Sequence, residues 1–353
     1  MGIERPCGVF DRNYSQDMAI CRTRFQWAAL IGFLVLLFGV FPLFASEYWF
    51  SVVNLMAITV IAVLGLQFLT GYCGLISIGH AAFMAVGSYI SAMLTTHLGW
   101  SFWVALPCAG IGAGIIGLIF GLPALRIKGF YIAVTTLAAH FVIIWAIVHG
   151  GDLTGGVMGL SAPAPKLGGI VFDSERAFFF LIVFVAVVMT FFGKSIMRGK
   201  IGRAFVAVRD NDIVAEFIGV NIFRYKVLAF ILSCLYAGIA GSLYAHYLGH
   251  INEELFPLIE SIWMLGMIII GGLGSITGAI FGAMFIRLLS YGIYYLTPMI
   301  GAAIPALEMS IANASTKLVF GVVIILFIVF EPRGLYHRWE IILTKARLWP
   351  FPY

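Results

Sequence analysis

Long apolar runs, separated by short polar breaks, dominate this chain. A helix needs about 20 mainly apolar residues to cross roughly 30 Å of hydrocarbon, and ten segments approach or exceed that length. The ten segments are residues 26–45, 50–70, 77–97, 101–124, 130–149, 177–193, 226–248, 258–272, 276–297 and 313–330. The pattern predicts an all-α polytopic membrane protein with about ten transmembrane helices.

Composition supports this fold class. The chain is 62% hydrophobic and only 10% charged, and its mean hydropathy is +1.04. A soluble protein of 353 residues would need far more polar surface to cover its core. We therefore expect a tail over residues 1–25, a transmembrane domain over 26–330 and a second tail over 331–353.

The basic residues indicate how the chain is oriented. Of the 21 Lys and Arg residues, 17 lie in the two tails, in residues 126–129 or in residues 194–226, all on one side of the predicted bundle. Because loops rich in Lys and Arg stay in the cytoplasm, we expect both termini to be cytoplasmic. The long Gly- and Pro-rich loop 150–177 is then external, and the charged segment 194–225 is cytoplasmic.

Within the charged segment, the stretch "RGKIGRAFVAVRDNDIVAEFIGVN" (198–221) shows helical spacing of its apolar residues. One set follows i, i+3, i+4 and i+7, and a second follows a polar break. The two sets are Ile201, Ala204, Phe205 and Val208, then Ile213, Val214, Phe217 and Ile218. We expect two short amphipathic helices that lie on the cytoplasmic surface.

The second of these helices has defined ends. Asp212 is the predicted N-cap, Glu216 lies in the first turn, and Gly219 supplies a left-handed C-terminal stop. Such a segment either anchors on anionic lipid or docks on a partner protein. The acidic residues, with Asp210 among them, would face lipid phosphate unfavourably. Docking is therefore the favoured interpretation.

Two glycine-rich segments interrupt the predicted spans, near residues 71–80 and 271–278. Small residues allow close helix packing. Alternatively, a broken helix exposes backbone amides to a substrate path, and a helix N-terminus attracts the carboxylate of a zwitterion. The candidate path residues are Gly74, Ser77, Gly79, His80, Gly274, Ser275 and Thr277.

Two other features suggest site chemistry. Arg287 lies within a predicted span, where a charge is costly and often functional, and we expect it to pair with Glu260 or Glu308 or to line a cavity. His246 and His250 are four residues apart and share one face if the helix persists. They lack the Glu of a His-Glu-x-x-His site, so we predict no metal centre.

Catalysis and ion coupling are not favoured. "FFGKS" (191–195) lacks the earlier glycine of a phosphate-binding loop, and the five cysteines show no paired spacing. An ion-coupled secondary transporter needs carboxylates embedded in the membrane, whereas the acidic residues here fall in tails, loops and span ends. A membrane enzyme would need a clustered His, Asp and Glu constellation, and none stands out.

Five motifs, in order over nearly the whole chain, resemble a known family. They are "GYCGLISIGHAAFMAVGSY" (71–89), "LTGGVMGL" (153–160), "GRAFVAVRDNDIVAEFIGVNIFRYK" (202–226), "IIGGLGSITGAIFGA" (269–283) and "FEPRGL" (330–335). The family is that of the LivM-type permease subunits of bacterial ABC importers for branched-chain, hydrophobic amino acids.

This resemblance implies the ABC importer permease fold, with a coupling helix within residues 198–221 that docks on an ATP-hydrolysing subunit. The general consensus there is Glu-Ala-Ala, three variable residues and Gly, of which only Ala215 and Gly219 are present. The expected coupling residues are Arg203, Arg209, Asp210, Asp212, Ala215, Glu216 and Gly219. The external loop residues Thr154, Gly155, Gly156 and Gly159 form either a plain connector or a gate touched by a docking protein.

The resemblance also implies a setting and partners. We expect the bacterial inner membrane, a second LivH-like permease subunit, two ATP-binding subunits and a periplasmic solute-binding protein. This chain would bind no cofactor and no nucleic acid, because ATP and Mg²⁺ are held by the partner subunits. The expected solute is a branched-chain amino acid, with urea, short amides or another small organic solute as the alternative.

Overall fold

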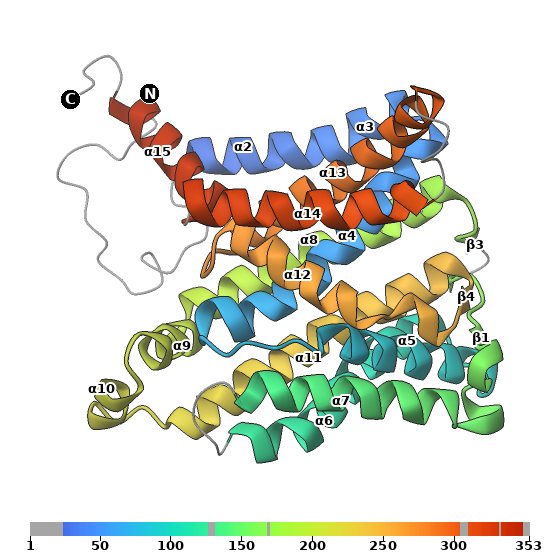
Figure 1. Ribbon diagram of the computed structural model, residues 1–353, viewed down its shortest axis with the longest axis horizontal. Coiled ribbons are helices and arrows are strands. Elements are labelled where there is room, and N and C mark those ends of the chain that lie inside the picture. Colours follow the sequence, from blue (N-terminus) through green and yellow to red (C-terminus); the bar gives the residue numbers. More distant parts are fainter. Residues whose placement is uncertain (1–23, 126–130, 168–169, 304–309, 332, 349–353) are drawn as a thin grey trace.

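The computed structural model describes residues 24–125, 131–167, 170–303, 310–331 and 333–348 and is built almost entirely of helices (Figure 1). The helices are α2 (Arg24–Val35), η1 (Leu36–Val40), α3 (Phe41–Phe44), α4 (Glu47–Leu66), η2 (Gln67–Tyr72), α5 (His80–Thr96), α6 (Phe102–Leu125), α7 (Tyr131–Val148), η3 (Gly151–Leu153), η4 (Gly156–Met158), α8 (Glu175–Arg198), α9 (Lys200–Asp210), α10 (Asp212–Phe217), α11 (Ile222–Leu248), η5 (Glu253–Leu255), α12 (Leu258–Gly271), α13 (Ile276–Ala303), α14 (Ser310–Phe330) and α15 (Gly334–Leu348). This confirms the predicted all-α membrane class.

Eight helical segments of the described chain are long and apolar enough to cross a membrane, or nine if the bent pair α14–α15 counts as one span. Nine of the ten predicted segments correspond to these spans. The tenth, 77–97, corresponds to α5, which begins only at His80 and, at 17 residues, is at the lower end of the length that crosses a membrane. Residues 74–79 form no helix, because Gly74 has φ +74° and breaks the chain direction.

The core lies around α11, which packs against α4, α5 and α6. Glycines allow these helices to approach closely, as the packing interpretation predicts. A Cβ atom at Gly87 on α5 would lie 2.3 Å from the Cα of Gly238 on α11. A Cβ at Gly65 on α4 would lie 2.8 Å from the carbonyl oxygen of Ser233. At these crossings the two backbones are in direct contact.

A Gly87→Leu variant should be clearly less stable than the wild type. Its side chain meets backbone rather than a movable side chain, so overpacking should cost about 1–3 kcal/mol or more and lower the apparent melting temperature in detergent by about 5 °C or more. Gly321→Leu is the matched control, because a Cβ there has no neighbour within 4 Å. Equal melting temperatures for the two variants would contradict the close crossing of α5 and α11.

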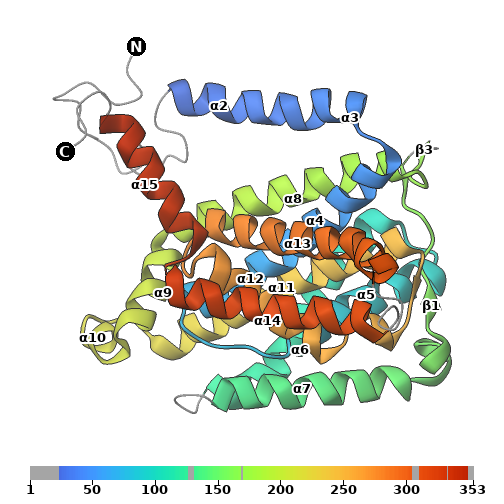
Figure 2. The same cartoon turned by 45° about the horizontal axis from the view of Figure 1, so that its top comes forward.

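The two ends of the bundle differ. Short strands cluster at one end, where β1 (Leu160–Ser161) pairs with β4 (His250–Ile251) and β2 (Lys166–Leu167) pairs with β3 (Ile170–Val171), both antiparallel. Helices α9, α10 and α15 lie at the opposite end in both views (Figures 1 and 2). Helix α2 stands apart from the bundle in Figure 2. Its apolar side chains Trp27, Ile31 and Phe33 are exposed. The exposed apolar side chains of α2 suit a helix surface that faces lipid.

Candidate functional site

Helix α9 packs its predicted apolar face onto the end of the bundle. Ala204, Phe205 and Val208 are buried, and the Phe205 ring meets the Tyr225 ring edge-on at 6.3 Å between centroids. The corner between α8 and α9 requires glycine, because a Cβ at Gly202 would lie 2.0 Å from a backbone oxygen of α8. The amphipathic interpretation of α9 is confirmed.

Helix α10 begins one residue earlier than predicted. Asn211, not Asp212, is the N-cap: its backbone is extended, and its side-chain oxygen accepts a hydrogen bond from Val214 N at 3.1 Å. Asp212 is the first helical residue, where a negative charge still suits the helix N-terminus. Gly219 has φ +87°, and its N–H donates to the Glu216 carbonyl at 2.9 Å. The predicted left-handed stop is confirmed.

The apolar side chains of α10 point away from the bundle. Phe217 is 85% exposed, whereas Ala215 is 1% exposed and anchors the helix to the bundle. We call the exposed set the α10 knob, and it consists of Ile213, Val214, Phe217 and Ile218. The prediction of two helices holds, but only α9 buries its apolar face against the rest of the chain. An exposed apolar patch with rigid ends is typical of a docking surface.

Arg209 connects these two helices to the membrane-embedded part of the chain. Its Nη1 donates to the carbonyl oxygen of Gly71, at the end of η2, at 2.9 Å. Its Nε donates to Asp210 Oδ1 at 2.9 Å. A Cβ at Gly274 would lie 2.7 Å from Arg209 Nη1, so the second glycine-rich segment also approaches this guanidinium. One side chain therefore touches both glycine-rich segments.

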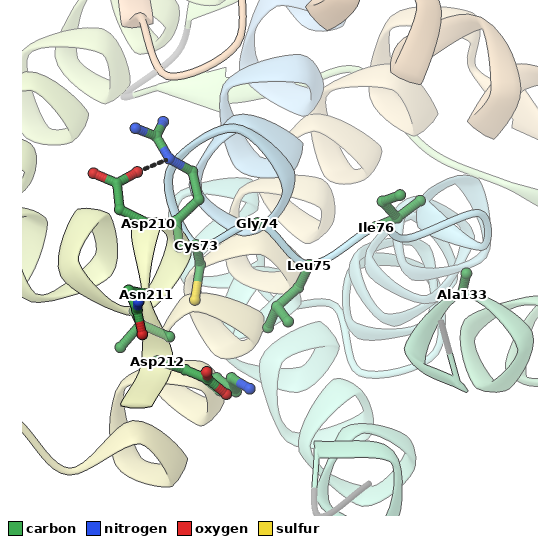
Figure 3. A pocket seen from close by; sticks show the side chains of 11 residues that line it. Cys73, Gly74, Leu75, Ile76, Ala133, Asp210, Asn211 and Asp212 are labelled. Carbon is green, nitrogen blue, oxygen red and sulfur yellow. Dashed lines mark hydrogen bonds and ion pairs between the residues drawn. The ribbon is translucent and has the colours of Figure 1, made fainter. Parts of the chain in front are cut away.

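A polar pocket of about 520 Å³ lies beside this contact (Figure 3). The turn between α9 and α10 and the non-helical residues after Cys73 line it, together with Lys226. Gly74 is the one predicted path residue among its lining residues. The pocket leaves space between the α9–α10 turn and the broken membrane segment.

The other predicted path residues of the first segment lie in tight packing. A Cβ at Gly79 would lie 2.0 Å from the carbonyl oxygen of Thr136. His80 is 1% exposed, and its Nε2 lies 2.9 Å from the carbonyl oxygen of Ala62. Ser77 is also buried, and its hydroxyl has no hydrogen-bond partner in the described part of the chain. The break before α5 is real, but these side chains line none of the larger pockets.

In the second segment, Ser275 caps helix α13. Its hydroxyl accepts a hydrogen bond from Gly278 N at 3.1 Å and lies 3.0 Å from Thr277 Oγ1. Gln67 donates to the carbonyl oxygens of Gly272 and Ser275 at 3.1 and 3.0 Å. These bonds tie η2 to the α12–α13 turn. Nothing in the spacing of the sequence indicated the role of Gln67, because its partners lie about two hundred residues away.

The loop after α7 has a fixed shape. Thr154 Oγ1 donates to the Ile147 carbonyl at 2.7 Å, and Gly155, Gly156 and Gly159 all have positive φ. A Cβ at Gly159 would lie 2.0 Å from a backbone oxygen of strand β4. The loop also displays apolar side chains, and Met158 is 86% exposed. It therefore presents a rigid, partly apolar surface at the strand end of the bundle.

The condition under which His246 and His250 would share one helical face is not met. Helix α11 ends at Leu248 with Gly249 in a left-handed conformation, and His250 belongs to strand β4. His246 is buried, with its ring nitrogens 2.9 Å from Ser91 Oγ and 2.7 Å from the Pro163 carbonyl oxygen. Within the described ranges, no three His, Cys, Asp or Glu side chains are grouped so as to hold a metal ion.

Comparison with known proteins finds a matching family and several similar proteins, and their descriptions agree. The family described as "Branched-chain amino acid transport system / permease component" matches residues 48–328. The chain is 29% identical over 330 residues to the high-affinity branched-chain amino acid transport system permease protein LivM of Escherichia coli K12, covering 87% of this chain and 74% of that protein.

Two further relatives extend the comparison. The high-affinity branched-chain amino acid transport system permease protein LivH of Salmonella typhimurium LT2 is 26% identical over 265 residues, covering 69% of this chain and 84% of that protein. A probable LivM of Methanocaldococcus jannaschii is 24% identical over 242 residues, covering 66% of this chain and 67% of that protein. No solved structure matches the chain.

Proposed function

The chain belongs to the branched-chain amino acid transport system permease family and is a transmembrane permease subunit of an ABC importer, and we propose that its solute is leucine, isoleucine or valine. The relatives named as branched-chain amino acid transport permeases support this solute class. We further propose that the subunit works in the bacterial inner membrane with both termini in the cytoplasm. The end that carries α9, α10 and α15 is then the cytoplasmic end.

The observation that carries the coupling proposal is the α10 knob. Phe217 and Ile218 extend from a helix whose two ends are fixed by Asn211 and Gly219. A groove on an ATP-binding subunit is a better partner for this shape than lipid, because Asp210 and the acidic first turn would face anionic headgroups. We propose that the knob is the coupling element of this subunit.

Arg209 gives the knob a mechanical connection to the membrane domain. When two ATP-binding subunits close on ATP, they displace α10, and α9 moves with it as a rigid element. The contact of Arg209 with Gly71 passes this displacement to η2 and to the broken segment that starts at Gly74. The beginning of α5 then moves, and the solute path alternates between its outward and inward openings. The chain itself contributes shape and charge, whereas its partners hold ATP and Mg²⁺.

We propose three kinds of partner: a LivH-like second permease subunit, two ATP-binding subunits and a periplasmic solute-binding protein. The loop after α7 suits the solute-binding protein, because its glycines fix its shape and Met158 is almost fully exposed.

A Met158→Glu variant should weaken this docking. Placing a charge at the centre of an apolar contact should raise the concentration of solute-binding protein needed for half-maximal uptake by about tenfold. Asp152→Asn changes charge on the same loop outside the apolar contact and serves as the control. Equal half-maximal concentrations for wild type and Met158→Glu would contradict the docking role of this loop.

The proposed function is tested by gentle affinity purification of this chain from its native membrane, followed by mass identification of co-purifying proteins. We expect two ATP-binding subunits and a second permease, and we expect the purified assembly to hydrolyse ATP faster when leucine-loaded binding protein is added. Repeated recovery of the chain without any ATP-binding subunit would refute the proposal.

A further inference from the structure

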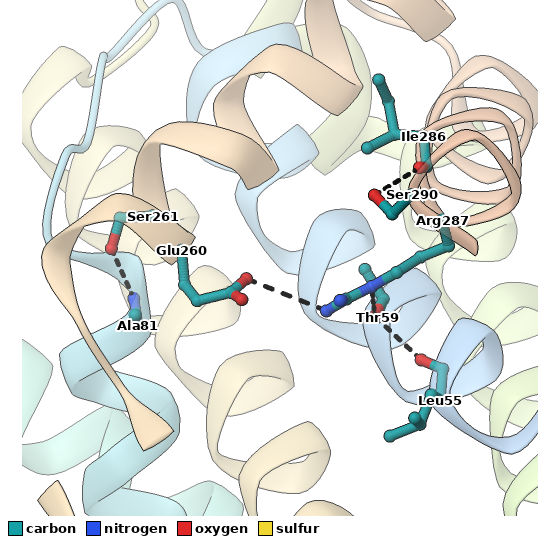
Figure 4. A network of polar contacts seen from close by, with 8 residues as sticks. All are labelled: Leu55, Thr59, Ala81, Glu260, Ser261, Ile286, Arg287 and Ser290. Carbon is teal, nitrogen blue, oxygen red and sulfur yellow. Dashed lines mark hydrogen bonds and ion pairs between the residues drawn. The ribbon is translucent and has the colours of Figure 1, made fainter. Parts of the chain in front are cut away.

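A small cavity of about 90 Å³ lies between α4, α5, α11, α12 and α13. Its walls combine two opposite charges with apolar side chains, which is unusual for space inside a membrane domain. The charged groups are Glu260 on α12 and Arg287 on α13, and Figure 4 shows them facing each other across the gap. The sequence left three possibilities for Arg287, and the structure supports two of them together: a pairing with Glu260 and a place in a cavity wall. Glu308 lies outside the described residues.

The two charged side chains do not form a direct hydrogen bond with each other. Arg287 Nη2 lies 3.8 Å from Glu260 Oε2, which exceeds the about 2.7–3.2 Å of a direct hydrogen bond. Arg287 is fixed elsewhere, because its Nε donates to Thr59 Oγ1 at 2.9 Å, and the Thr59 hydroxyl donates to the Leu55 carbonyl at 2.8 Å. Glu260 Oε2 is buried and accepts no hydrogen bond from any residue that the structure describes.

A buried ion pair without a direct hydrogen bond contributes little to the stability of the fold. Burying both charges is expensive, and only close, fully hydrogen-bonded geometry offsets that penalty. Here Thr59 holds the guanidinium while the carboxylate oxygen remains unused. The pair therefore has bonding capacity left for a third group that carries both a negative and a positive charge.

A zwitterionic α-amino acid matches this requirement. Its carboxylate would bond to the guanidinium of Arg287, and its ammonium would donate to Glu260. Helix α5 adds to the positive side, because its N-terminus approaches α12 here: Ala81 N donates to Ser261 Oγ at 2.9 Å. An isolated cation or anion would satisfy only one of the two charges.

The remaining wall of the cavity suits an aliphatic side chain. Leu55, Ile58, Met84, Phe256 and Met264 form an apolar surface beside the charges. The volume of about 90 Å³ corresponds to about three water molecules at about 30 Å³ each, so the cavity must widen to enclose the side chain of valine or leucine.

We propose that this cavity is a binding site for a zwitterionic branched-chain amino acid within the membrane domain, with Arg287 as the carboxylate ligand and Glu260 as the ammonium ligand. Thr59 is a positioning residue for the guanidinium. This inference rests on the proposed function, since the solute must reach the cavity from the importer's path.

The experiment uses the complete importer in proteoliposomes. One side of the membrane carries the ATP-binding subunits and receives ATP, and the opposite side receives leucine-loaded binding protein. Glu260→Gln and Arg287→Gln should each lower the rate of leucine uptake by about tenfold or more, because a hydrogen bond between charged groups is lost. Assembly of each variant with its partner subunits is measured in parallel, so that uptake is compared among assembled importers only. Glu175→Gln is the matched control, because Glu175 accepts hydrogen bonds from Asn54 and Tyr247 without lining the cavity.

A double variant separates binding from mere stabilisation. If the pair only stabilises the fold, Glu260→Gln with Arg287→Gln restores uptake, because replacing both charges relieves the unpaired one. If the pair binds solute, the double variant remains as inactive as the single variants. Restored uptake in the double variant would overturn the site.

Met264→Phe tests the same site without changing its charges. By filling the apolar part of the cavity, it should lower leucine uptake by about tenfold and spare alanine uptake, as a pocket contact does. Unchanged preference for leucine, with Glu260→Gln and Arg287→Gln at wild-type rates, overturns the site while the importer function stands. Absence of leucine uptake by the wild-type importer overturns both proposals.

Discussion

A chain carrying Gly219→Trp should insert and assemble as the wild type does but import leucine at least about tenfold more slowly, while ATP hydrolysis continues. Gly219 has φ +87°, which costs any other residue roughly 1–2 kcal/mol in strain. A Cβ there meets nothing within 4 Å, so the substitution disturbs no packing. The strain instead shifts the end of α10 and thereby the direction in which Phe217 and Ile218 point.

The control for this variant is Gly99→Trp. Gly99 also has positive φ, at +63°, and a Cβ there has open space within 4 Å. It comes three residues after the end of α5, where Thr96 donates a hydrogen bond to the carbonyl oxygen of Ser161 in β1 at 2.7 Å. Strand β1 and helix α10 lie at opposite ends of the molecule (Figure 1). The two variants therefore carry the same backbone strain and the same new side chain at opposite ends. Equal uptake rates for both would rule out a special role of the α10 terminus.

Arg209→Ala should have an effect of similar size through a different contact. The variant loses the bond between Arg209 Nη1 and the Gly71 carbonyl, which ties α9 to η2. A hydrogen bond from a charged donor contributes about 1.5–3 kcal/mol, and Arg209 is partly exposed, so the lower end of that range applies. Coupling energies of this order correspond to about a tenfold change. We expect leucine uptake to fall about tenfold with ATP hydrolysis largely retained.

Two comparison variants refine this prediction. Arg209→Lys keeps the charge but not the planar fork that reaches Gly71 and Asp210 together, so it should restore only part of the uptake. Lys200→Ala removes a positive charge from the exposed start of the same helix and should leave uptake unchanged. If Lys200→Ala and Arg209→Ala behave alike, net charge rather than the Gly71 contact accounts for the effect.

The sequence was informative wherever local periodicity decides structure. The spacing of Ala204, Phe205 and Val208 predicted the buried face of α9, and Gly219 predicted the end of α10. Hydropathy alone located the helices, but it does not register a backbone break inside an apolar run. The start of α5 was therefore placed before Gly79, although residues 74–79 form no helix. The expected coupling and path residues remain predictions, since geometry alone does not test them.

Contacts between distant segments were out of reach for a single sequence. Arg209 was expected to contact the ATP-binding partner, but its guanidinium reaches Gly71, 138 residues away. The charge of Arg287 pointed to a functional role, but its geometry with Thr59 depends on the packing of α4 against α13. Asn and Asp are almost equally favoured as N-cap residues, so the sequence did not distinguish between the neighbours Asn211 and Asp212.

The most direct test of the account is a photo-cross-link from the α10 knob. A photoreactive phenylalanine at position 217 should, on irradiation of the assembled importer, yield an adduct of this chain with an ATP-binding subunit. The same group at Phe192, which is 65% exposed on the apolar flank of α8, should cross-link to lipid instead. If position 217 gives only lipid adducts, like position 192, then α10 lies on the membrane and is not the coupling element.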